Sequence, residues 1–213
     1  LGGGMIETSG SQSFGGAVTL LDNTNLVGDS LALSSGVEGG TKNLVLDFAQ
    51  TTSLDGSFAN ITDLTSEGNV SLNGTISTLG NQSYKGNATL SGDTTLEGTS
   101  LALSNGLEGG TKNLVLNFAQ TTSLDGSFAN ITDLTSEGDV SLNGTISTLG
   151  NQVYNAGANL AGDTRLEGSS LSVANVDGQT KNLVLDFAQT TSLDGRFANI
   201  ADLTSEGDVS LNG

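Results

Sequence analysis

A long internal repeat constrains this chain more than any other feature of its sequence. The segment from Thr41 to Gly74 recurs from Thr111 with two substitutions, and a third version begins at Thr180. Repeats of this kind stack on their neighbours, because one unit cannot bury its apolar side chains alone. We therefore expect residues 1–213 to form one continuous β-solenoid domain. Its three repeats are in phase over residues 5–74, 75–144 and 145–213.

Short segments inside each repeat alternate in hydrophobicity. In NLVLDF, for example, Leu44, Leu46 and Phe48 fall on one side of an extended chain. A period of two predicts β-strands, and the Gly, Asn, Asp and Ser residues between the segments predict turns. Two Asn-Gly pairs are predicted to be tight turns between strands. These pairs are Asn73-Gly74 and Asn143-Gly144.

Apolar pairs recur along the chain at fairly regular intervals, and we interpret them as anchors of a single face. The anchors are Val18/Leu20, Leu44/Leu46, Val70/Leu72, Ala88/Leu90, Leu114/Leu116, Val140/Leu142, Ala158/Leu160, Leu183/Leu185 and Val209/Leu211. Six leucines are expected to point inward on one sheet: Leu44, Leu46, Leu114, Leu116, Leu183 and Leu185. The valines between them are expected to point outward: Val45, Val115 and Val184.

The pattern predicts an all-β fold, a parallel β-solenoid in which short strands of successive coils stack into sheets. The anchors indicate about nine coils, with three coils in each repeat of about 70 residues. A helical fold is disfavoured because Gly is spread throughout the chain and the segments are short. An array of β-sandwich domains would also contain short strands, but its repeat is usually nearer to roughly 90–100 residues.

The composition excludes several classes of function. The chain has no His and no Cys, so the common zinc, haem, iron–sulfur and Ser–His–Asp sites cannot be built from it. Its 6 basic and 23 acidic residues give a net charge of −17, which disfavours binding to nucleic acid or to an anionic membrane surface. No apolar run approaches the roughly 18 residues of a membrane-spanning helix. We expect no nucleic-acid partner and no membrane insertion.

The surplus of acidic residues raises the hypothesis of a Ca²⁺ site, which needs roughly six to eight converging oxygen ligands. Asp55, Asp63 and Glu67 have counterparts at the same positions of the next repeat, so any such site would be repeated. However, no EF-hand or nonapeptide calcium motif is present. We interpret these residues as solvated turn residues and expect no metal site.

A polysaccharide-cleaving β-helix would need a unique cluster of carboxylates with basic residues on one face. In this chain the acidic residues are repeated, and the basic residues that look individual are Arg165 and Arg196. We therefore predict that the protein is not an enzyme and has no catalytic residue and no cofactor.

Three Thr-Thr pairs raise the hypothesis of an ice-binding face: Thr51-Thr52, Thr121-Thr122 and Thr190-Thr191. An ice-binding face would need Thr on every coil, whereas these pairs occur once in each repeat. We interpret them as structural residues of strands, where β-branched side chains pack well.

Three segments resemble the repeats of large exported bacterial adhesins of the filamentous-haemagglutinin type, the passenger proteins of two-partner secretion. The segments are NQSYKGNATLSGDTTLEGTSLAL, TKNLVLDFAQTTSLDG and SEGNVSLNGTISTLG. The resemblance covers essentially the whole chain. It implies a right-handed parallel β-helix and an extracellular location at the bacterial outer surface. The secretion domain and the C-terminal effector region of that family have no counterpart in these residues.

Two functional hypotheses follow from the repeats and the resemblance. In the first, the chain is a structural segment of a secreted, cell-surface adhesin and acts as a rigid elongated stalk. In the second, it is a subunit of a self-associating extracellular filament stacked end to end. The expected partners are flanking repeats of the same protein or copies of the chain itself, and a host-cell or matrix surface would be contacted through other regions. Near-identical repeats favour both hypotheses, because a spacer or a polymer needs only length.

Overall fold

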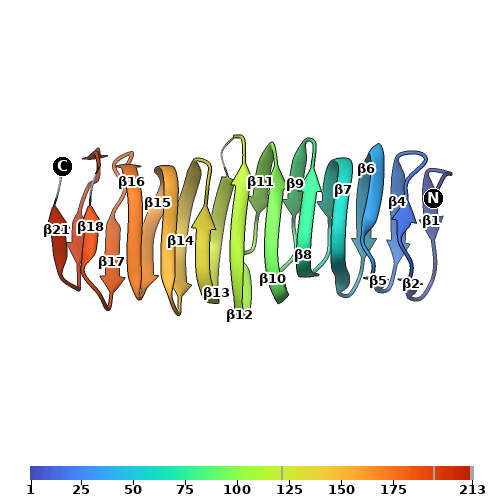
Figure 1. Ribbon diagram of the computed structural model, residues 1–213, viewed down its shortest axis with the longest axis horizontal. Coiled ribbons are helices and arrows are strands. Elements are labelled where there is room, and N and C mark those ends of the chain that lie inside the picture. Colours follow the sequence, from blue (N-terminus) through green and yellow to red (C-terminus); the bar gives the residue numbers. More distant parts are fainter. Residues whose placement is uncertain (121, 194, 212–213) are drawn as a thin grey trace.

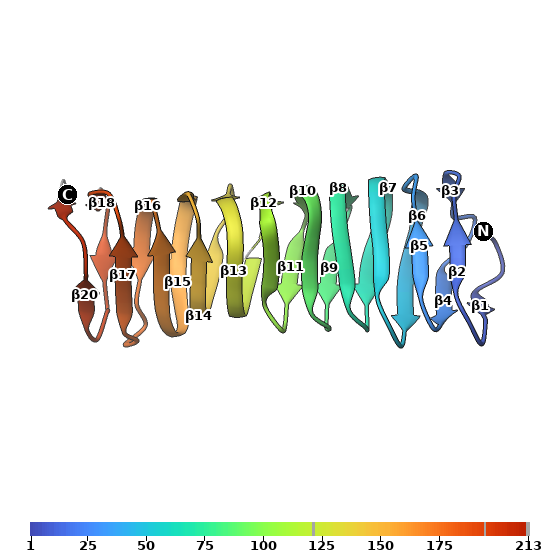
Figure 2. The same ribbon diagram turned by 90° about the horizontal axis from the view of Figure 1, so that it is seen from below.

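Parallel β-strands stack one above another along a rod, with the N-terminus at one end and the C-terminus at the other (Figure 1). The computed structural model describes residues 1–213 except 121, 194, 212 and 213. No helix occurs among the described residues. The view turned by 90° shows the same single stack from below (Figure 2). The all-β fold and the parallel β-solenoid that the sequence predicts are both confirmed.

The strands of the described residues follow one another without any other regular element. They are β1 Met5–Glu7, β2 Gln12–Phe14, β3 Val18–Thr19, β4 Thr24–Gly28, β5 Leu31–Leu33, β6 Val37–Phe48, β7 Thr52–Ser66, β8 Val70–Thr78, β9 Asn81–Tyr84, β10 Ala88–Gly98, β11 Ser100–Leu103, β12 Leu107–Phe118, β13 Thr122–Ser136, β14 Val140–Thr148, β15 Asn151–Gly168, β16 Ser170–Asp177, β17 Leu183–Phe187, β18 Thr191–Leu193, β19 Phe197–Ala198, β20 Leu203–Ser205 and β21 Val209–Leu211.

The paired segments form three parallel ladders, and each turn of the chain adds one rung to each ladder. Ladder I passes through Ile6, Leu26, Leu46, Ser66, Tyr84, Leu103, Leu124, Leu142 and Leu160, and ends with the rungs of Val176 and Phe197. Ladder II passes through Gln12, Leu31, Thr52, Val70, Ala88, Leu107, Phe128, Ile146, Leu166, Leu185 and Ser205. Ladder III passes through Val18, Val37, Phe58, Ile76, Leu96, Leu116, Ser136, Tyr154, Val173, Leu193 and Leu211.

The repeat does not span a whole number of turns. Leu46, Leu116 and Leu185 occupy the same position in the three repeats, yet they lie in ladders I, III and II respectively. Together the three repeats make about 11 turns, so each repeat makes about three and two-thirds turns. Successive repeats are therefore rotated by about one-third of a turn about the rod axis, and a residue returns to the same ladder only after three repeats.

This arrangement corrects three predictions: the number of turns, the number of turns per repeat and the single face of the anchors. The solenoid has about 11 turns rather than nine, and about three and two-thirds turns per repeat rather than three. The nine anchors do not share one face, because Leu44, Val70 and Leu114 lie in ladders I, II and III. The apolar segments between the anchors, such as β5, form complete rungs of their own. A turn therefore closes earlier than the anchor spacing indicates, and Leu46 pairs with Leu26 rather than with an anchor residue.

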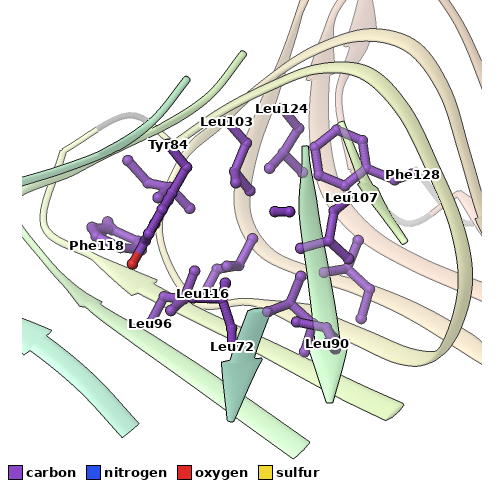
Figure 3. Close-up of a cluster of buried hydrophobic side chains, with 14 of the residues drawn as sticks. Leu72, Tyr84, Leu90, Leu96, Leu103, Leu107, Leu116, Phe118, Leu124 and Phe128 are labelled. Carbon is purple, nitrogen blue, oxygen red and sulfur yellow. The ribbon is translucent and has the colours of Figure 1, made fainter. Parts of the chain in front are cut away.

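Apolar side chains from the three ladders meet along the axis of the rod. Figure 3 shows Leu103 and Leu124 from ladder I pointing toward Leu107 and Phe128 from ladder II, with Leu116 from ladder III below them. Each of these side chains is at most 3% exposed. The six leucines predicted to point inward are 0–1% exposed, which confirms their inward position, although they lie in three ladders and not on one sheet. The three valines predicted to point outward are half-buried.

The two Asn-Gly pairs predicted to be tight turns lie inside strands instead. Asn73-Gly74 belongs to β8, which runs without a break from ladder II to ladder III, and Asn143-Gly144 has the same place in β14. Gly74 has a φ of +90°, and a Cβ atom there would lie 2.4 Å from the carbonyl oxygen of Gly56 in the neighbouring rung. Glycine is required because it bends the strand at a corner where the rungs touch.

Candidate functional site

The acidic residues considered as calcium ligands each contact the next rung of the solenoid. The Asn73 side-chain amide donates to Asp55 over 2.8 Å, and the Asn81 backbone N–H donates to Asp63 over 2.8 Å. Lys85 forms an ion pair of 2.7 Å with Glu67. The counterparts of these carboxylates in the next repeat, Asp125, Asp133 and Glu137, accept equivalent bonds of 2.7 to 2.8 Å.

These carboxylates serve rung-to-rung bonding and do not converge on a common point. Within the part of the chain that the structure describes, no group of three or more His, Cys, Asp or Glu side chains is placed to hold a metal ion. The arrangement is a set of polar contacts on the outside of the rod, in which each of these carboxylates contacts a donor in the next rung.

The threonine pairs have one buried member and so do not form a flat exposed array. Thr52, Thr122 and Thr191 are at most 1% exposed, and their hydroxyls have no hydrogen-bond partner among the described residues. Thr51 and Thr190 are exposed, whereas Thr121 lies outside the described residues. The buried position supports a structural role in the strands.

Arg165, which has no basic counterpart in the other repeats, joins three carboxylates from three successive rungs. Its Nη1 lies 3.0 Å from Glu206 Oε1, its Nη2 lies 2.5 Å from Asp186 Oδ2, and its Nε donates to Glu167. The hydrogen bond from Arg165 lowers the pKa of Glu206, and the bonds to Glu206 and Glu167 raise the pKa of Arg165. This cluster is a charge-pairing arrangement on the rod surface.

The Arg165 cluster is one of three equivalent columns of outward side chains, one for each repeat sequence. The first column contains Asp47, Glu67 and Lys85, the second Glu97, Asn117, Glu137 and Asn155, and the third Glu167, Asp186 and Glu206. Neighbouring rungs are about 4.8 Å apart, so stacked carboxylates repel one another. In the first column Lys85 forms an ion pair with Glu67. In the second, Asn117 lies between Glu97 and Glu137, and the Asn155 side-chain amide donates a hydrogen bond to Glu137. In the third, Arg165 pairs with all three carboxylates.

A buried polar network recurs inside the rod, and the sequence analysis did not identify it. The Tyr84 hydroxyl donates to Gln82 Oε1 over 2.9 Å, and Gln82 Nε2 donates to the carbonyl oxygens of Ile76 and Glu97 over 2.9 and 2.8 Å. Burial raises the pKa of the Tyr84 hydroxyl, which therefore remains a donor. The signal for the network is Gln and Tyr two residues apart, because alternate residues of a strand point to the same side.

Two shallow grooves lie at equivalent places in consecutive repeats. The first, about 330 Å³, is lined by Asn87, Thr89 and Glu108 among others, and the second, about 160 Å³, includes Asn159 and Asp177. Their linings combine small apolar residues, such as Ala88 and Ala158, with these polar side chains.

Arg196, the other individual basic residue, lines the smaller groove beside Asp177. The pKa of Asp177 is lowered, chiefly because the Asn199 side-chain amide donates a hydrogen bond to it, with a smaller contribution from the charge of Arg196. Neither groove brings together a nucleophile, a base and an acid.

Comparisons with protein-family models, with curated proteins and with solved structures give no match for this chain. Among the described residues, no helix has both the length and the apolar character needed to cross a membrane.

Proposed function

We propose that the chain is a rigid, elongated stalk segment of a secreted bacterial adhesin of the filamentous-haemagglutinin type, located at the outer surface of the cell. The observation that carries the proposal is the rotation of successive repeats by one-third of a turn. Equivalent surface residues are thereby distributed around the rod and do not align into one continuous face. Such a repeat extends the rod and leaves adhesion and any effector activity to other regions.

The continuous core supports a stiff rod. Buried apolar side chains of successive turns belong to one cluster, which extends from Val18 to Leu193. Each turn adds about 4.8 Å, so about 11 turns give a rod of roughly 53 Å. Because the connections between rungs are short, bending would require a loss of inter-rung hydrogen bonds.

The proposal is tested by removing residues 75–144 and measuring both length and binding. Gly74 then precedes Thr145 as it precedes Thr75 in the intact chain, so the junction is preserved. We expect a folded rod that is shorter by about 18 Å in solution scattering, since about three and two-thirds turns are lost. We also expect that neither rod binds host cells or matrix proteins. Specific binding by the intact chain alone would overturn the stalk proposal in favour of a ligand-binding module.

The filament hypothesis remains the second candidate, and one observation favours it. Three repeats make about 11 turns, so a copy placed further along the rod axis would continue the same three ladders without rotation.

A further inference from the structure

Asparagine followed by glycine is a dipeptide prone to spontaneous loss of the asparagine amide. Glycine has no Cβ, so its backbone nitrogen can approach the asparagine side chain and attack it. The described residues contain three such pairs, which are Asn73-Gly74, Asn105-Gly106 and Asn143-Gly144. A fourth pair, Asn212-Gly213, lies outside the described residues. The three described pairs have the same chemistry, but the solenoid holds them differently.

Two of the pairs are held within strands by neighbouring rungs on both sides. Gly74 pairs with Gly56 in one rung and with Thr94 in the other. The side-chain amide of Asn73 donates a hydrogen bond of 2.8 Å to Asp55. Asn143-Gly144 has the same contacts one repeat later. In both pairs the attack would require strand pairing to open and the asparagine side chain to leave its carboxylate partner.

Asn105-Gly106 lies at a corner between β11 and β12, and the backbone bonds that hold the same corner in repeat 1 are missing there. In repeat 1 the Gly36 N–H donates to the Asp55 carbonyl over 3.0 Å, and the Gly36 carbonyl accepts from the Val18 N–H over 3.3 Å. Gly106, the counterpart of Gly36, makes neither bond in the described part of the chain. The exposed Asn105 is joined to the preceding rung through its side-chain amide, which donates to the Lys85 carbonyl over 2.7 Å.

We propose that Asn105 is a site of spontaneous deamidation. The Gly106 nitrogen bonds to Cγ of Asn105 and loses its proton to solvent, while Nδ2 leaves as ammonia, which closes a succinimide ring. Water then opens either carbonyl of the ring and leaves aspartate or isoaspartate, so the net reaction consumes water and releases ammonia. Both residues line the groove of about 330 Å³, and through this groove water reaches Gly106, which the neighbouring rungs otherwise cover.

The reaction removes the side-chain contact that joins this corner to the preceding rung. In aspartate a carboxylate oxygen replaces the amide nitrogen, so an acceptor instead of a donor faces the Lys85 carbonyl. Isoaspartate also lengthens the backbone by a methylene group. The corner is tight, since a Cβ atom on Gly106 would lie 2.0 Å from the Ser127 carbonyl oxygen. The solenoid is therefore weakened at this corner as the protein ages, a property that a stalk does not require.

Peptide mapping by mass spectrometry tests the site. Tryptic cleavage after lysine and arginine places the three pairs in separate peptides, and fragmentation locates the modified residue. After incubation of the folded protein in mildly alkaline buffer, we expect the mass increase of amide-to-acid conversion at Asn105 well before Asn73 and Asn143. In urea the three should react at similar rates, because the solenoid no longer distinguishes them. Equal rates in the folded protein, or no reaction at Asn105, would overturn the proposal.

Two substitutions exchange the residues of the matched corners. Ser35→Asn creates the dipeptide where the glycine N–H is hydrogen-bonded. This bond must break before attack, so the variant should react at position 35 about tenfold more slowly than at Asn105. Asn105→Ser should abolish the reaction in the peptide of repeat 2 and keep a rung contact, because Ser35 donates to the Gly15 carbonyl over 2.9 Å. Equal rates at positions 35 and 105 would show that the dipeptide alone, and not the corner, sets the rate.

Melting curves test the effect of the reaction on the solenoid. Asn105→Asp reproduces one product and should melt below the intact chain, whereas Asn105→Ser should melt with it. Ageing should lower the melting temperature of the intact chain and leave that of Asn105→Ser unchanged. Equal melting temperatures of Asn105→Asp and the intact chain would contradict the loss of a rung contact. None of these results changes the length and binding measurements that test the stalk.

Discussion

The second halves of repeats 2 and 3, which begin at Thr111 and Thr180, have nearly the same sequence, but equivalent side chains in them differ in their exposure to solvent. Leu134 in repeat 2 is fully buried, whereas Leu203, its counterpart in repeat 3, is 46% exposed. Leu134 lies between paired rungs on both sides, and Leu203 is paired on one side among the described strands. In this solenoid the burial of a side chain therefore depends on whether a further rung is stacked on it. Stability accumulates from contacts between neighbouring rungs.

The largest expected effect is a difference in stability between alanine variants at one matched position of the two repeats. Leu134→Ala should lower the free energy of unfolding by about 2–5 kcal/mol, because it leaves a cavity between two rungs. Leu203→Ala should cost less than about 1 kcal/mol in the monomer, because the exposed side chain loses little burial. Urea unfolding of the two variants at low protein concentration measures both values. Equal costs would show that stability does not depend on stacked rungs.

A smaller effect on stability is expected at the buried glutamine, which has a tyrosine partner in repeat 2 but not in repeat 1. Phe14 stands where Tyr84 stands in the next repeat, and Gln12 Oε1 has no hydrogen-bond partner among the described residues. Tyr84→Phe should cost about 1–2 kcal/mol, because it leaves Gln82 Oε1 buried without a donor. Phe14→Tyr should increase stability by up to about 1 kcal/mol by supplying the missing donor.

Thermal or urea unfolding of the two variants and their double variant checks this prediction. We expect Tyr84→Phe to lower the free energy of unfolding and Phe14→Tyr to raise it. Destabilisation by Phe14→Tyr would contradict the assignment of the missing hydroxyl as the cause of the unpaired Gln12 oxygen.

The smallest expected effect is on the pH and salt dependence of stability, which should differ between the charged columns of repeats 2 and 3. The pKa of Glu206 is lowered by its hydrogen bond to Arg165, so the unfolded chain binds more protons at this residue as the pH falls. The contribution of Glu206 to stability is therefore present above its ordinary unfolded pKa and is lost as the pH falls through the folded value. Arg165→Gln should remove this part of the pH dependence and lower the melting temperature slightly, more at low salt than at high salt.

Asn117→Asp is the matched change in repeat 2, where it places a third carboxylate between Glu97 and Glu137 without a basic partner in the column. Melting curves at pH 7 and pH 4 should show a small destabilisation at pH 7 that decreases on acidification. A destabilisation that is the same at both pH values would indicate that packing and not charge is responsible.

The sequence predicted the parallel solenoid and the inward leucines, but not the number of turns. The alternation of Leu44, Leu46 and Phe48 predicts a strand, because alternate residues of a strand point to the same side. This is a local property of the sequence. The ladder to which a segment belongs is not local. It depends on how much of the chain is needed to close one turn, and the segments between the anchors close it early.

The polar sites also divide into features that the local sequence indicates and features that only the tertiary structure shows. The repeated acidic residues indicated a shared role, and the structure shows that role to be bonding between rungs, as when Asn73 donates to Asp55. The network of Gln82 and Tyr84 could have been inferred from their spacing of two residues. The cluster of Arg165 with Glu206 could not, because 41 residues separate them in sequence and two turns of the solenoid bring them within 3.0 Å.

By itself, the sequence determined the repeat, the strands and the side of each strand that faces inward, because these follow from patterns within a few residues. Only the tertiary structure decided that a repeat covers about three and two-thirds turns and that successive repeats are rotated. The physical reason is that the length of one turn is set by packing between rungs and not by the repeat. One turn takes from 18 residues, as between Leu54 and Leu72, to 21 residues, as between Leu33 and Leu54, so a repeat of about 70 residues does not contain a whole number of turns. Leu46, Leu116 and Leu185 have the same local sequence, and this mismatch places them in three different ladders.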